Sequence, residues 1–130
     1  MRFMMIMLPE VYSKPVGPDF VPDRNALEKM GKYNEQLQKA GVLLTLDGLT
    51  PPSAGARVTF AGGQAKVTDG PFTQAKDVVG GYWMIQVKSR DEAIEWAKRC
   101  PAGANDVIEI RQVHEAADFE PKAARVKDAT

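Results

Sequence analysis

Two strand–helix–strand patterns constrain the fold of this 130-residue chain more than any other feature. In the first, a continuous apolar run at 2–8 predicts a strand near the centre of a sheet. Apolar residues then recur at three- and four-residue steps between Pro22 and Ala40, which predicts an amphipathic helix. A second apolar run at 42–46 follows, so the first pattern closes with a strand.

The second pattern occupies the later part of the chain. An apolar run at 78–87 predicts the longest strand, and Ser89 with Glu92 has the spacing of a capping box that begins a helix. Alternating residues at 107–113 predict the last strand. The glycine pair Gly80-Gly81 indicates a bulge or the close approach of another group.

Between the two patterns the sequence predicts a β-hairpin. Residues 57–60 and 65–68 alternate, and the four residues between them, Ala61-Gly62-Gly63-Gln64, suit a turn. Polar residues on one face of these strands place them toward the edge of the sheet.

Together these elements predict an α+β fold, a ferredoxin-like antiparallel sheet with two helices on one face and an extra hairpin. We expect one domain at 1–113 and a C-terminal tail at 114–130, which has few apolar residues. The second face of such a sheet carries apolar side chains that the helices do not cover. Leaving apolar surface in water costs about 25 cal/mol of free energy per Å². We therefore expect a homodimer in which two copies pack sheet to sheet.

Composition narrows the classes of partner. The chain has 17 basic and 17 acidic side chains, so no excess positive charge recruits a nucleic acid. Pro9 and Glu10 end the first apolar run well before membrane-spanning length. A single cysteine, Cys100, excludes an intrachain disulfide and fits a cytoplasmic protein. The glycine pairs lack the context of a phosphate-binding loop, so no cofactor is expected.

Asp69, in the run Asp69-Gly70-Pro71-Phe72, is the main candidate for chemistry. In a partly dry cleft its carboxylate could act as a general acid or base, and in a turn it would bind backbone amides instead. Asp47 is a weaker catalytic candidate. It could pair with Asp69 and divide acid and base roles, or it could begin an Asp-Gly turn.

Three further residues are candidates for ligand binding. Tyr33 could point its hydroxyl into a cleft or lie in the core. Phe72 could stack on a ligand or fill the barrel, and Lys76 could neutralise an anionic ligand or stay solvated. His114 has no His or Cys neighbour in sequence, so no metal site is expected. Cys100 ends a helix, which disfavours a thiolate nucleophile.

Three stretches of the sequence resemble one known family. The run VTDGPF, the upstream AGVLLTLDGLTPP, and Trp96-Ala97 before Cys100-Pro101 are similar to the DGPF subgroup of the YCII-related proteins. The resemblance implies a ferredoxin-like fold paired into a dimeric α+β barrel. It also implies a bacterial protein whose gene accompanies that of an extracytoplasmic-function sigma factor.

The resemblance implies no established reaction. In the wider family, a histidine on the first helix has been linked to catalysis, but this chain has Lys32-Tyr33-Asn34 there. Three hypotheses stay open: a small-molecule enzyme using Asp69, a non-catalytic ligand-binding or partner protein linked to a sigma factor, and a structural dimer without an active site. The sequence does not decide whether the protein is an enzyme.

Overall fold

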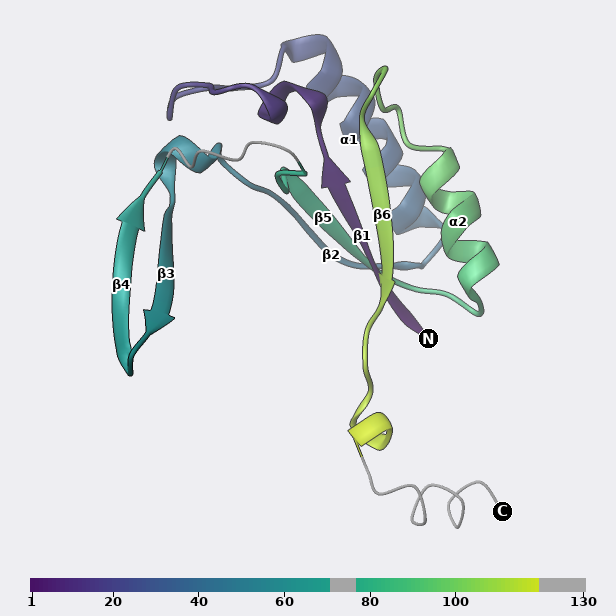
Figure 1. The fold of residues 1–130 in the computed structure, drawn as a ribbon. Coiled ribbons are helices and arrows are strands. Elements are labelled where there is room, and N and C mark those ends of the chain that lie inside the picture. Colours follow the sequence, from purple (N-terminus) through teal and green to yellow (C-terminus); the bar gives the residue numbers. More distant parts are fainter. Residues whose placement is uncertain (71–76, 120–130) are drawn as a thin grey trace.

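The computed structural model describes residues 1–70 and 77–119 and shows an α+β fold (Figure 1). Its main sheet has four strands in the order β2-β5-β1-β6, and every neighbouring pair is antiparallel. The strands are β1 (Arg2–Leu8), β2 (Leu43–Gly48), β5 (Gly81–Gln86) and β6 (Val107–Gln112). Helices α1 (Arg24–Lys39) and α2 (Arg90–Lys98) cover one face, as the sequence predicted.

Both helices begin at side-chain caps, and the one at Ser89 is the capping box that the sequence predicted. The Asp23 side chain accepts a hydrogen bond from the backbone amide of Ala26 at 3.0 Å. The Ser89 hydroxyl accepts one from the amide of Glu92 at 3.1 Å, and the Glu92 carboxylate reaches back to the amide of Lys88 at 2.7 Å. These bonds satisfy amides that have no partner inside the helix.

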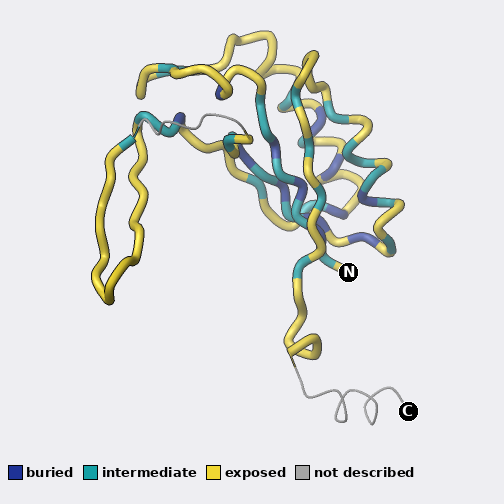
Figure 2. Tube along the Cα trace, in the orientation of Figure 1, coloured by how far each residue is buried: buried dark blue, intermediate teal, exposed yellow. Residues whose placement is uncertain are grey.

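The core lies between the helices and the sheet (Figure 2). Along β1, alternate side chains point toward the helices and are buried, as the period of a strand requires. The buried cluster comprises Phe3, Met5, Met7, Tyr33, Leu37, Val42, Trp83, Ile85, Val87 and Ala93.

Within residues 1–70 and 77–119, no helix lies over the other sheet face, which we call the open face (Figure 1). The intervening residues of β1, such as Met4 and Ile6, point to this side and are only half-buried. In register with them, Met84 of β5 and Glu109 of β6 also belong to the open face.

The hairpin is placed differently from our expectation. Strands β3 (Ala56–Ala61) and β4 (Gln64–Asp69) form a separate two-stranded sheet, so their expected position at the edge of the main sheet is wrong. The chain leaves the main sheet at Pro51 and turns through a short 3-10 helix, η2 (Pro52–Ala54). Proline cannot donate to a strand ladder, so the main sheet cannot continue through this segment. We call β3 and β4 the arm.

The glycine pair at the start of β5 marks a close approach and not a bulge. A side chain at Gly80 would lie 2.6 Å from Cγ of Pro9, and one at Gly81 would lie 3.0 Å from the carbonyl oxygen of Asp47. The irregularity in the sheet lies instead in β2, between Leu43 and Thr45.

The remaining short elements are 3-10 helices, η1 (Glu10–Ser13) and η3 (Ala116–Phe119). Glu115, just before η3, binds Nε of Arg2 at 2.9 Å, which ties the end of the described chain to β1. Among the described helices, none has the length and apolar character needed to cross a lipid bilayer.

Candidate functional site

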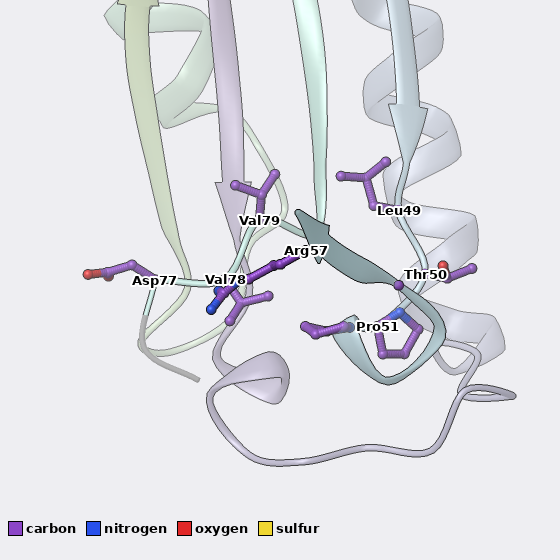
Figure 3. Close-up of a pocket in the computed structure, with 9 residues that line it drawn as sticks. Leu49, Thr50, Pro51, Arg57, Asp77, Val78 and Val79 are labelled. Atoms are coloured by element: carbon purple, nitrogen blue, oxygen red, sulfur yellow. The ribbon is translucent and has the colours of Figure 1, made fainter. Parts of the chain in front are cut away.

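A cavity of about 440 Å³ lies where the arm leaves the main sheet (Figure 3). Its volume falls in the lower part of the range of small-molecule sites, roughly 300–1,000 Å³. Three segments form its walls: the chain after β2, the start of β3 and the chain before β5. The lining residues are Leu49, Thr50, Pro51, Pro52, Gly55, Arg57, Asp77, Val78 and Val79.

Hydrogen bonds hold the wall that follows β2. The amide of Leu49 donates to the carbonyl of Gly80 at 2.9 Å, which extends the pairing of β2 and β5 to the cavity. The hydroxyl of Tyr12 donates to the carbonyl of Leu49 at 2.9 Å, and Pro51 is buried beneath. This wall is therefore fixed by the backbone of the main sheet.

The base of the arm closes the adjoining wall. The amide of Gly70 donates to the carbonyl of Gly55 at 2.9 Å, directly after the last pair of the hairpin ladder. A Cβ atom at Gly70 would overlap the carbonyl oxygen of Pro52, so only glycine fits there. The glycine of the Asp-Gly-Pro-Phe run thus has a structural role at the cavity.

The cavity has apolar walls and charged side chains. Figure 3 shows Arg57 extending from β3 toward Val78, while the side chain of Asp77 points away. Asp77 has a positive φ of 59°, a conformation that aspartate tolerates better than most residues. Leu49 and Val79 supply apolar surface. A guanidinium beside such walls suits a ligand with an anionic group and an apolar body.

A polar pair lies on the open face one step from the cavity. The hydroxyl of Tyr82 donates to Oδ2 of Asp47 at 2.7 Å, and the two residues are direct neighbours across β2 and β5. This hydrogen bond to the carboxylate raises the pKa of Tyr82. Asp47 precedes the cavity residue Leu49 by two positions, so both belong to one side of the strand.

Sequence reasoning missed Tyr82 and Arg57 as site residues. The alternation of the β5 segment assigned Tyr82 to the face opposite Trp83, but it could not reveal that β5 pairs with β2. Nothing in the sequence around Arg57 apart from its charge indicated a binding role. The residue lines the cavity because the fold brings the start of β3 beside the segments before β5 and after β2.

The two predicted catalytic carboxylates lie on different sheets. Asp47 is in β2, and Asp69 is an exposed residue at the end of β4, opposite Ala56. Asp47 binds Tyr82, and Asp69 is not among the described residues that line the cavity. The turn amides beyond Gly70 that the Asp69 carboxylate could bind begin at Phe72, because Pro71 has no N–H. Phe72 and Lys76 belong to 71–76, outside the described residues.

Tyr33 lies in the core. It is 2% exposed, and its hydroxyl donates to the carbonyl of Trp96 at 2.7 Å. Its ring meets that of Trp83 edge to face, with 5.7 Å between the centroids. Burial raises the pKa of Tyr33, which keeps the hydroxyl protonated.

Cys100 is a free cysteine in a half-buried position. Burial raises the pKa of Cys100 to about 11, and nearby Asp106 adds to this effect. Its sulfur lies 4.0 Å from that of Met30. Within residues 1–70 and 77–119, no three His, Cys, Asp or Glu side chains form a group that could hold a metal ion.

Comparisons with known proteins identify relatives. The family model described as the YCII-related domain matches residues 1–117. An uncharacterized protein of Rhizobium meliloti is 27% identical over 99 residues, which cover 76% of this chain and 79% of that protein.

Proposed function

The chain belongs to the YCII-related family, and we propose that it binds a small organic anion in the cavity beside Arg57. The observation that carries the proposal is the Arg57 guanidinium beside the apolar residues of the cavity, from which the side chain of Asp77 points away (Figure 3). Arginine presents its N–H groups in a fixed fork that matches a carboxylate, and such charge-assisted bonds are roughly twice as strong as those between neutral groups. The apolar walls favour a ligand with a hydrocarbon or aromatic body.

The polar pair gives the ligand a second point of attachment. Asp47 and Tyr82 lie two rungs along the β2–β5 ladder from Leu49, or about 7 Å at the usual rise of a strand. A molecule that fills the cavity and extends along the open face reaches two acceptors there, the Asp47 carboxylate and the Tyr82 oxygen, because the one hydroxyl proton of Tyr82 is donated to Asp47.

Acid–base chemistry through Asp69 is a further part of the proposal. Its support is the resemblance of VTDGPF to the DGPF subgroup and its place next to Gly70, which binds the cavity residue Gly55. The variant Asp69→Asn should leave the melting temperature nearly unchanged, because exposed substitutions usually alter stability by less than about 0.5 kcal/mol. A large fall would favour the alternative turn role.

The same resemblance supports proposals on the oligomeric state of the protein and on its place in the cell. We infer a homodimer, since the open face presents half-buried apolar side chains of β1 such as Met4 and Ile6. Membership of the DGPF subgroup, a bacterial cytoplasmic setting and a link to a sigma factor follow from the motif alone. A non-catalytic binding protein and a structural dimer are the alternatives that the anion test distinguishes.

The test compares an anion with its neutral analogue. We expect benzoate to bind the protein in saturation-transfer NMR, and benzamide to bind at least about tenfold more weakly, since it lacks the charge. Arg57→Gln should abolish benzoate binding. The matched control is Lys66→Gln, which removes an exposed cation from the same hairpin outside the cavity. Equal binding of benzoate to the Arg57→Gln and wild-type proteins would contradict the proposal.

A further inference from the structure

The arm has no covering layer among the described residues. All twelve residues of β3 and β4 are exposed, and the two strands pair only with each other (Figure 2). An isolated two-stranded hairpin is at best marginally stable in water. A surface that covers one face of the arm would therefore stabilise it.

The two faces of the arm differ in chemistry. In the hairpin register Val58 lies opposite Val67, and Phe60 lies opposite Ala65, so these residues share one face. Phe60 is 80% exposed, Val67 65% and Val58 51%. The other face carries polar side chains, among them Thr59 opposite Lys66. The arm is thus amphipathic, with its apolar face in solvent.

The arm projects from the side of the main sheet that the helices leave open. In Figure 1 the helices lie on one side of the sheet and the arm on the other. In Figure 3, where the helices lie behind the sheet, β3 lies in front of it. Six residues per strand give the arm a length of about 20 Å. A molecule seated on the open face therefore comes within reach of the arm.

We propose that the apolar face of the arm packs against a second copy of this chain, docked on the open face. The inference rests on the proposed homodimer and adds the contact that the arm makes. A stable interface buries about 800 Å² per partner from roughly 20–30 residues, which three large apolar side chains cannot supply. The arm and the open face supply it together.

Symmetry favours a second copy over an unrelated protein. Every chain carries both surfaces on one side, and a two-fold axis covers both in both copies at once. The chain has 17 basic and 17 acidic side chains, so two copies have no net charge repulsion. Arg57 lies in β3 on the polar face with Thr59, so the proposed contact leaves this cavity residue on the other side of the arm.

A photo-crosslink locates the contact. We place p-benzoylphenylalanine at position 60 and mix ¹⁵N-labelled with unlabelled chains. The proposal expects crosslinked peptides that contain one labelled and one unlabelled chain, joined to strands β1 or β5 of the partner. Crosslinks confined to single chains, in a protein that is dimeric by light scattering, would overturn it.

A charge substitution on the apolar face measures how much the arm contributes to dimerisation. Phe60→Lys should weaken dimerisation at least about tenfold, as expected for a buried aromatic anchor. Thr59→Lys adds the same charge to the polar face and should leave the dimerisation constant unchanged. If both variants and the wild type have equal dimerisation constants, the arm contact is refuted, but the homodimer is not. A wild-type monomer refutes the homodimer and the arm contact together, whereas benzoate binding tests the cavity separately.

Discussion

At Gly70 the lack of a side chain lets the backbone pack closely against Pro52 at the base of the arm. A Cβ there would overlap the carbonyl oxygen of Pro52, so Gly70→Ala must move backbone. We expect a loss of about 1–3 kcal/mol in the free energy of unfolding, the usual cost of overpacking, measured by urea denaturation. The control is Gly55→Ala, whose Cβ would lie at an ordinary 3.5 Å from the same oxygen. Equal stability of the two variants would contradict this reading of the arm base.

Cys100 gives a pH dependence at the residue scale. Burial raises the pKa of its thiol to about 11, above its ordinary value of 9.0. The neutral thiol is therefore favoured in the folded state, and its contribution to stability is present below about pH 9 and lost as the pH rises through 11. We expect iodoacetamide to modify Cys100 slowly near pH 8 and faster toward pH 11. In urea the same thiol should react readily at about pH 8, and fast labelling of the folded protein would contradict its burial.

The pair across β2 and β5 is tested at the scale of the elements. The hydrogen bond from Tyr82 to Asp47 raises the pKa of the tyrosine, so Asp47→Asn should lower it toward its ordinary value near 10. ¹³C-labelled tyrosine followed by NMR titration measures the change. Tyr12 and Tyr33 are internal controls, because burial raises their pKa values independently of Asp47. An unchanged Tyr82 titration would show that β2 and β5 do not pair in this register.

The elements also show what sequence patterns can predict. Apolar periodicity and a capping box predicted both helices and the approximate place of each described strand, because these signals are local. The expected longest strand at 78–87 is wrong, since β5 covers only Gly81–Gln86 and β1 is longer. Alternation does not name the partner of a strand, so the hairpin was assigned to the edge of the wrong sheet. For the same reason the partnership of Tyr82 with Asp47 was hidden. The cavity depends on contacts between distant segments, such as Leu49 with Gly80, and no local signal encodes it.

The open face sets the behaviour of the whole molecule. A chain of 14.3 kDa that pairs through this face should have twice that mass in light scattering. Ile6 lies in the central strand β1 and is only half-buried in the single chain, so a homodimer would bury it further. Ile6→Lys then places an unpaired charge at the interface, and we expect dimerisation to weaken by at least about tenfold.

The control for this variant is Gln38→Lys, which adds the same charge to an exposed position of α1. Circular dichroism must show both variants folded, since lysine at a half-buried site can extend its amine to water. Monomeric Ile6→Lys beside dimeric Gln38→Lys assigns the interface to the open face. If both stay dimeric with the wild-type constant, the copies meet elsewhere, and the arm then has no second copy within its reach.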